Sequence, residues 1–356
     1  MKLTDICDFQ GGSQPPKEEW SFDKQDGYVR MLQIRDFTQS ERVTPEYIKI
    51  SNSTKVCEAD DILIARYGAS IGKILTGLAG AYNVAIMRTI PDTSKIKKKY
   101  LYYYLKSSYF QNAIINVGSR AAQAGFNKED LSKLDIECPK LVEQEGVINI
   151  LEKIEAVIEK QKEELTSLDD LIKARFVEMF GDENNSRNWN VVNVEEVADV
   201  QVGVVIKPSQ YYTDESNGVK AFRSLNIGAG FIKDIDWAYF TKEGHLKNSK
   251  SILKENDLLI VRSGAPGTAC VVTEEFAGCN AVDVIIAHLD CEKVNPYYLC
   301  TFTNMPHGKK QINEGTGGAA QQHFNVGKYN KLRLMLPPKM LQDEFAVFIQ
   351  QVNKSK

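Results

Sequence analysis

The longest regular pattern of apolar positions lies in the middle of the chain. Between Val147 and Met179, positions that are apolar except for Gln161 and Arg175 recur at alternating intervals of four and three, and neither Pro nor Gly occurs from Val147 to Phe180. This spacing predicts a helix with a coiled-coil seam, and Gly181 follows as its C-terminal cap. From about Val142 to Phe180 the helix is roughly 58 Å long at 1.5 Å per residue. The seam residues that we expect to pair with another helix are Val147, Leu151, Ile154, Ile158, Leu165, Leu168 and Ile172.

A shorter apolar pattern follows Pro337 and Pro338. Its seam residues, spaced by four, three and four, are Leu341, Phe345, Phe348 and Val352. Proline suits the first turn of a helix, so this pattern predicts a second helix of about five turns. Because an apolar stripe is not stable in water, we expect the two helices to pair antiparallel. The shorter helix covers about half of the longer one, which leaves the seam from Leu165 to Met179 without a partner in the chain.

The segments that flank the central helix favour short buried strands. Residues 62–65 and 84–87 are apolar runs bounded by Gly, Asn or Asp. Apolar residues at intervals of four predict a helix over 100–113, and residues 135–139 suit a last strand that ends at a proline. The pattern as a whole is that of an α+β protein.

The two halves of the chain repeat one another. Residues 121–127 (AAQAGFN) return 198 positions later as residues 319–325 (AAQQHFN). The other repeated pairs, in the same order, are 3–10 with 194–201, 30–34 with 223–227, and 61–69 with 257–265. A period this long indicates a duplicated domain rather than a solenoid. We therefore expect two similar modules at 1–139 and 183–337, the central helix at 140–182 and the C-terminal helix at 338–356, and we expect a target that is read at two places.

Composition and charge narrow the class of protein. The formal net charge is -3, and residues 140–182 carry 6 Lys and Arg against 11 Asp and Glu, so the modules themselves are near neutral. This distribution permits DNA binding but does not indicate it. Seven cysteines without a Cys-x-x-Cys pair fit a reduced, cytoplasmic setting. No apolar run reaches the roughly 18 residues that cross a bilayer, and the start does not resemble a signal peptide, so we expect no membrane contact.

This order of elements resembles the specificity (S) subunit of Type I restriction-modification enzymes, over nearly all of the chain. The motifs that carry the resemblance are an Arg-x-Leu-x-Ile strand, an Asp-(Ile/Leu)-Leu-Ile-x-Arg-x-Gly-Ala strand and loop, and an Ala-Ala-Gln-x-x-Phe-Asn loop. They begin at Arg30 and Arg223, at Asp61 and Asp257, and at Ala121 and Ala319. Each motif is degenerate alone, but their recurrence in one order around heptad helices is specific.

The resemblance implies two target-recognition domains, each of which reads one half of a bipartite sequence in double-stranded DNA. It also implies that the helices dock methyltransferase (M) subunits, which carry S-adenosylmethionine, and that a motor-nuclease (R) subunit joins the full complex. The S subunit itself has no catalytic role and no cofactor. In this family the terminal helix is usually about as long as the central one. Three explanations of the unpaired seam therefore stay open: an M subunit covers it, another copy covers it, or this is a truncated form whose assembly differs.

Basic and amide side chains on glycine-rich loops are the candidates for DNA contact. Arginine can pair with guanine or clamp a phosphate, and glutamine can read adenine. An arginine that only ties down its own loop carbonyls explains Arg66 and Arg262 equally well. The full candidate set is Arg35, Arg66, Lys73, Ser119, Arg120, Gln123, Arg262, Thr316, Gln321, Gln322 and His323.

Signatures of catalysis are missing from the sequence. There is no Asn-Pro-Pro-Tyr-like tetrad of an amino-methyltransferase, and the four histidines have no metal-binding spacing. Residues 68–73 imitate a phosphate-binding loop, but the glycines are one residue too close and Ile74 replaces the required Ser or Thr. Two alternatives stay open: a recognition subunit for a fused nuclease-methyltransferase of the Type IIG kind, and a coiled-coil scaffold whose modules bind protein.

Overall fold

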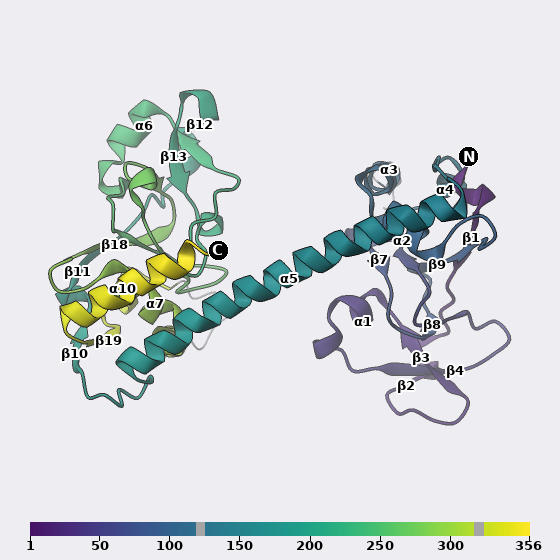
Figure 1. The fold of residues 1–356 in the computed structure, drawn as a ribbon, viewed down its shortest axis with the longest axis horizontal. Coiled ribbons are helices and arrows are strands. Elements are labelled where there is room, and N and C mark those ends of the chain that lie inside the picture. Colours follow the sequence, from purple (N-terminus) through teal and green to yellow (C-terminus); the bar gives the residue numbers. More distant parts are fainter. Residues whose placement is uncertain (119–124, 317–323) are drawn as a thin grey trace. The chain divides into compact units, whose positions relative to one another are not determined.

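The computed structural model describes residues 1–118, 125–316 and 324–356 (Figure 1). It forms two compact units, Met1–Glu159 and Lys160–Lys356. Helix α5 (Leu141–Phe180) is continuous and contributes residues to both units. The prediction of an α+β chain with two β-rich modules around one long central helix is confirmed.

In the first unit, strands form two sheets and helices follow them. The strands are β1 (Cys7–Gly11), β2 (Trp20–Ser21), β3 (Tyr28–Leu32), β4 (Glu46–Lys49), β5 (Val56–Cys57), β6 (Leu63–Ala65), β7 (Ile74–Leu75), β8 (Gly80–Tyr82) and β9 (Ile86–Pro91). Besides α5, the helices are α1 (Ile34–Thr38), α2 (Lys98–Lys106), α3 (Ser108–Gly118) and α4 (Lys128–Ser132). The strand orders are β1-β9-β6-β7 in one sheet and β2-β4-β3-β8-β5 in the other.

In the second unit the same plan recurs. The strands are β10 (Asn190–Asn193), β11 (Ala198–Val202), β12 (Tyr212–Thr213), β13 (Val219–Phe222), β14 (Ala238–Phe240), β15 (Leu258–Val261), β16 (Ala269–Val271), β17 (Asn280–Ala281), β18 (Val284–Leu289) and β19 (Arg333–Leu336). The helices are α6 (Lys242–Lys247), α7 (Pro296–Asn304), α8 (Pro306–Thr316), α9 (Val326–Asn330) and α10 (Lys339–Asn353). The strand orders are β11-β18-β15-β16, β12-β14-β13-β17 and β10-β19.

The repeat in the sequence is a repeat in the structure. Antiparallel pairing sets Ile64 of β6 opposite Met87, and it sets Ile260 of β15 opposite Ile285 at the equivalent place. Both strands are buried along their whole length, because α2 and α3, or α7 and α8, pack on one face and the second sheet packs on the other. Burial on two faces explains why these strands are unbroken apolar runs.

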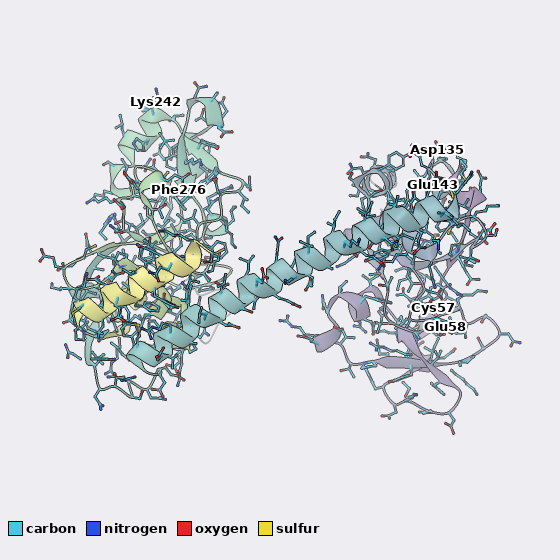
Figure 2. The ribbon with its side chains drawn as sticks, viewed as in Figure 1. Cys57, Glu58, Asp135, Glu143, Lys242 and Phe276 are labelled. Carbon is cyan, nitrogen blue, oxygen red and sulfur yellow. The ribbon has the colours of Figure 1, made fainter. Side chains whose placement is uncertain are left out.

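Two local predictions were wrong. The helix expected over 100–113 is two helices, because Ser107 has an extended backbone and its Oγ accepts a hydrogen bond from Phe110 N at 3.3 Å, which starts α3. Residues 135–139 do not form a strand: Asp135, labelled in Figure 2, makes only an isolated bridge with Lys2. The equivalent segment of the second unit is a true strand, β19, because the four residues of β10 pair with it.

Helix α10 packs antiparallel along the last turns of α5 (Figure 1). Arg175 Nη2 lies 3.3 Å from Glu344 Oε1, and Lys356 Nζ lies 2.6 Å from Asp169 Oδ1, so residue numbers rise on one helix as they fall on the other. The ring of Phe345 lies 5.4 Å from the rings of both Phe176 and Phe180. The end of the seam therefore has a partner within the chain.

The expectation that the seam from Leu165 to Met179 is unpaired is corrected by this packing. Ile172, Phe176 and Met179 belong to the core cluster that also contains Leu341, Phe345 and Phe348. The reason is connectivity: β10 follows the end of α5 and pairs with β19, and β19 leads directly into α10. Helix α10 therefore begins beside the end of α5.

The earlier part of the seam is exposed. The exposed fractions are 40% for Val147, 49% for Ile154, 45% for Ile158 and 42% for Leu165. Leu151 and Leu168 are partly buried, and Val352 of α10 is buried. For the exposed residues, pairing with another helix stays a prediction.

A buried glutamine at the start of each helix fastens it to its unit. Gln144 Oε1 accepts a hydrogen bond from Lys97 N at 2.8 Å, and Gln342 Oε1 accepts one from Asn295 N at 2.8 Å. Both glutamines are fully buried, and each donates to the carbonyl of the proline before its helix, Pro139 or Pro337, at 2.8 Å. This duplicated clamp was not predicted, although the two glutamines are 198 positions apart like the loop motif.

Candidate nucleic-acid interface

An arginine joins two of the predicted loops in each unit. Arg66 directly follows β6, and its Nε donates to the carbonyl of Phe126 at 3.3 Å. Arg262 directly follows β15, and its Nε donates to the carbonyl of Phe324 at 3.4 Å. Both phenylalanines stand at the end of the glutamine-containing loops. The structure thus brings the base of that loop to the strand-end arginine in each unit.

The remaining contacts of these arginines differ between the units. Arg262 Nη1 forms an ion pair with Asp283, and only 16% of its side chain is exposed. Arg66 Nη1 instead donates to the carbonyl of Val84 at 3.4 Å, and its guanidinium lies 5.0 Å from the centre of the Tyr67 ring. At this place the first unit has Asn83, Val84 and Ala85, between the equivalents of Ala281 and Val284, and none of the three is a carboxylate. A carboxylate therefore neutralises the arginine of the second unit only.

The Phe-Asn half of the loop motif is structural. Phe126 and Phe324 are 2% and 1% exposed. Asn127 Oδ1 accepts from Asp130 N at 3.1 Å and Asn325 Oδ1 accepts from Lys328 N at 3.0 Å, so each asparagine caps the following helix, α4 or α9.

The amide-bearing half of the motif lies outside the described residues. It contains Ser119, Arg120, Gln123, Gln321, Gln322 and His323, and the side chain of Thr316 is not described either. Their contact with DNA stays a prediction.

The glycine loops close in the same way in both units. Gly72 N donates to Ala65 O at 2.9 Å, and Gly267 N donates to Val261 O at 2.9 Å. Both glycines have positive φ, +81° and +74°. A Cβ at Gly267 would stand 2.4 Å from Ile312 Cδ1, so only glycine fits there.

The side chains that fasten these loops were missed in the sequence. Gln111 Nε2 donates to the carbonyl of Gly72 at 2.9 Å. Lys309 Nζ donates to the carbonyl of Pro266 at 3.1 Å and lies 3.4 Å from Thr268 Oγ1. The only available signal is that Gln111 and Lys309 are 198 positions apart. Lys73, a predicted contact, is exposed on the loop.

Arg35 belongs to a different part of the first unit. It lies in α1 and pairs with Glu46 of β4, which also accepts from Gln33 Nε2 at 2.9 Å. This pair stands on the second sheet, so the described contacts do not bring Arg35 together with Arg66.

The aspartates of the repeated strand motif are also structural. Asp61 Oδ2 accepts from the backbone N of Glu58, which Figure 2 labels, at 2.9 Å, and it lies 2.8 Å from Arg88 Nε. Burial favours the neutral acid, but the Glu58 amide, Lys98 and Arg88 together lower the pKa of Asp61. In the second unit Asp257 Oδ1 instead lies 2.6 Å from His288 Nδ1, a contact that the sequence did not reveal.

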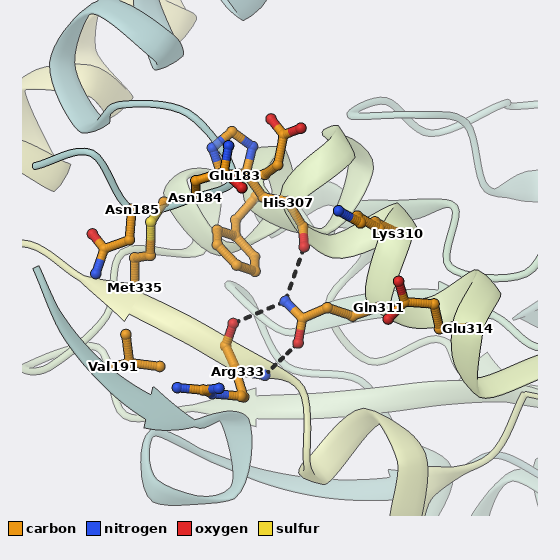
Figure 3. A pocket seen from close by; sticks show the side chains of 11 residues that line it. Glu183, Asn184, Asn185, Val191, His307, Lys310, Gln311, Glu314, Arg333 and Met335 are labelled. Carbon is orange, nitrogen blue, oxygen red and sulfur yellow. Dashed lines mark hydrogen bonds between the residues drawn. The ribbon is translucent and has the colours of Figure 1, made fainter. Parts of the chain in front are cut away.

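The second unit also contains a pocket of about 630 Å³ (Figure 3). Gln311 is one of its lining residues, and its Nε2 donates to the carbonyls of His307 at 2.9 Å and Arg333 at 3.0 Å. The pocket is lined by both cations, Lys310 among them, and anions such as Glu314. Mixed charge does not suit a phosphate backbone, so we do not assign the pocket to DNA.

The part of the chain that the structure describes contains neither a metal-binding group of side chains nor a membrane-spanning helix. Within it, His, Cys, Asp and Glu side chains form no group of three suited to a metal ion. Its helices include none with the length and apolar character to span a bilayer.

Comparisons with known proteins agree with this architecture. The specificity subunit of the Type I restriction enzyme MjaVIII from Methanocaldococcus jannaschii is 25% identical over 236 residues, which are 61% of this chain and 53% of that protein. The chain thus spans about half the length of this curated relative. The structure of a Type I restriction-modification S subunit from M. genitalium aligns with 100% of this chain and 89% of its own, with a TM-score of 0.51 at 14% identity.

A second solved structure, from work on complex assembly and conformational transition of the type I R-M system, gives a TM-score of 0.51 at 15% identity, over 100% of this chain and 90% of its own. At these identities the solved structures support the fold alone. The sequence match is broader: residues 1–167 and 186–356 each match the Type I restriction modification DNA specificity domain. Each match spans the sheets, paired loops and helix start described above, and the chain belongs to this family.

Proposed function

We propose that this chain is the DNA-recognition subunit of a Type I restriction-modification enzyme and reads a bipartite site. The observation that carries the proposal is the duplicated loop pair: in each unit an arginine, Arg66 or Arg262, holds the base of a glutamine-containing loop against a strand-end loop. Two equivalent loop pairs on one chain suit a target with two separate halves. In this proposal residues 1–139 and 183–337 are the target-recognition domains.

Within each domain, we assign the base-reading role to the amide side chains and the backbone-binding role to the cations. Glutamine presents a donor and an acceptor that match adenine in the major groove. Gln123 serves one half-site, and Gln321 and Gln322 serve the other. Arg66, Lys73 and Arg120 in the first domain, with Arg262 in the second, contact phosphate or guanine. Ser119, Thr316 and His323 complete the loop contacts, and Arg35 is a separate contact from α1.

The helices, 140–182 and 338–356, are proposed to dock methyltransferase subunits. The exposed apolar residues of α5, such as Ile154 and Ile158, support a helical partner there. S-adenosylmethionine then belongs to those subunits, a motor-nuclease subunit completes the assembly, and this chain performs no chemistry. The proposed complex acts on double-stranded DNA in the cytoplasm.

The test is selection of binding sites from random double-stranded DNA by the full chain purified with its methyltransferase subunits. We expect a split motif. Gln123→Ala should relax the preference in one half, and the double variant Gln321→Ala/Gln322→Ala should relax it in the other, because each removes a base contact worth about 1–3 kcal/mol. Lys95→Ala, an exposed lysine paired with Asp92 outside both helices and outside the candidate set, is the control and should leave the motif unchanged.

Other outcomes separate the alternatives. A single contiguous motif would contradict the two-reader proposal. Association that is insensitive to salt, without any retained DNA, would favour a protein-binding scaffold. Selection by this chain only together with a fused nuclease-methyltransferase would favour the Type IIG kind of assembly.

A further inference from the structure

Each unit places one lysine where the glycine loop meets the helix behind it, but the two lysines come from opposite sides. In the first unit the loop contributes Lys73, and the helix α3 contributes Gln111. In the second unit the loop contributes Thr268, and the helix α8 contributes Lys309. The lysine therefore stands on the loop in the first unit and on the helix in the second.

The backbone establishes that these positions are equivalent. Ala65 N donates to Lys73 O at 2.9 Å, and Val261 N donates to Thr268 O at 2.9 Å, in the same hairpin closure. The residue before each, Gly72 or Gly267, has positive φ. The backbone is therefore the same at these positions of the two units, and only the side chains differ.

Lys309 holds a positive charge that the second unit does not balance. Its Nζ donates to one carbonyl and lies near one hydroxyl, and an ammonium has a third N–H. Among the described residues no carboxylate pairs with it, and burial lowers its pKa. The seven residues 317–323 contain no Asp or Glu. A partly buried cation normally has an anionic partner, so its counter-ion is expected from outside the chain.

We propose that Lys309 is a phosphate-binding residue of the second domain and replaces, from the helix side, the ammonium that Lys73 supplies in the first. This inference rests on the proposed DNA-binding function. The carbonyl of Pro266 and the hydroxyl of Thr268 orient the ammonium at the loop, and a DNA phosphate completes its donors. Gln111 fastens the loop in the first unit without charge, which shows that charge is not needed for fastening.

The chain's own repeat supplies the test. Lys309→Gln copies the first unit on the helix side and should keep the loop fastened while removing one charge. The double variant Thr268→Lys/Lys309→Gln copies the first unit on both sides. Affinity of the full chain for a fluorescent duplex of random sequence is measured by anisotropy across a range of salt concentrations. The slope of log K against log salt is negative, and loss of one phosphate contact lowers its magnitude by about 0.9.

We expect Lys309→Gln to lower the magnitude of the slope by that amount and the double variant to restore it. Hydrogen exchange at Val261 N, which reports the hairpin closure, should stay unchanged in both. If Lys309→Gln keeps the wild-type slope, or if the double variant fails to restore it, the inference is wrong. If the wild-type chain shows no salt-dependent binding of DNA, the proposed function itself fails. The two failures are therefore distinguishable.

Discussion

The same helix face is buried in the second unit and exposed in the first. Phe345 and Val352 of α10 are 0% and 7% exposed, and the rings of Phe176 and Phe180 at the end of α5 pack against Phe345. The equivalent residues of the first unit, 198 positions earlier, are Val147 and Ile154, with exposed fractions of 40% and 49%. A duplicated domain therefore does not imply duplicated surroundings: the side chain at each position follows what packs on it.

The side chain is larger in the unit where the position is buried. The second unit has Phe345 where the first has Val147, and the larger ring contacts Phe176 and Phe180. The charges differ too, because Asp283 neutralises Arg262 while Arg66 has no equivalent carboxylate. In the second unit this helix face is therefore buried and the strand-end arginine is paired with a carboxylate. In the first unit the face is exposed and the arginine has no such carboxylate.

Truncation of the packed face should have the largest effect. Phe345→Ala removes a fully buried ring and should lower the free energy of unfolding of the second unit by about 3–5 kcal/mol. The matched variant Val147→Ala should change the stability of the first unit by no more than about 0.5 kcal/mol, because the side chain is exposed. Native-state hydrogen exchange in α7 and α2 measures the two units separately. Equal losses would contradict the comparison.

Removal of the glutamine clamp should affect both units alike. Gln144→Ala and Gln342→Ala each leave a helix-start amide, of Lys97 or Asn295, without its buried acceptor. Each should cost about 1–3 kcal/mol, since an unpaired buried polar group loses its solvation. Exchange rates of these two amides are the measurement. A large loss in one unit only would show that the clamp is not equivalent in the two.

Removal of the carboxylate that pairs with Arg262 should make the charge at this site of the second unit similar to that of the first. Asp283 has a φ of +49°, a conformation that asparagine also tolerates, so Asp283→Asn removes the charge without strain. We expect tighter DNA binding and a stronger salt dependence, because the contact that Arg262 makes with DNA is no longer weakened by the carboxylate beside it. Asp290→Asn, which removes a partly exposed carboxylate paired with Lys293, is the control for net charge. A similar gain in the control would show that the effect is not local to Arg262.

The features that sequence predicted are those with local or periodic causes. The central helix follows from its heptad spacing, and the repeat itself predicted two similar domains. The break at Ser107 was missed because one side-chain hydrogen bond decides it. The position of α10 along α5 was missed because it depends on the pairing of β10 with β19, which are far apart in the chain. The contacts of Lys309 with Pro266 and Thr268 are likewise made through space, and spacing alone does not reveal them.

The smallest expected effect is the pH dependence that His307 gives to the stability of the second unit. His307 stands at the position of Tyr109 in the first unit. His307 is 4% exposed, and its Nε2 lies 3.1 Å from Gly181 O at the end of α5. Burial lowers the pKa of His307, although the nearby Gly181 carbonyl and Glu183 act in the opposite direction. The unfolded chain therefore binds the proton first as the pH falls. The free energy of unfolding of the second unit should decrease from the ordinary histidine range, near about pH 6.5, down to the folded-state pKa, by at most about 1.4 kcal/mol per pH unit.

The variant His307→Gln keeps a donor for Gly181 O and removes the titration. Its second unit should lose less stability than the wild type between about pH 7 and about pH 5, whereas the first unit, which has Tyr109 at this position, should respond equally in both proteins. Denaturant unfolding followed by hydrogen exchange in each unit is the measurement. If the wild type and the variant lose the same stability on acidification, His307 is not the group that makes the packed unit sensitive to acid.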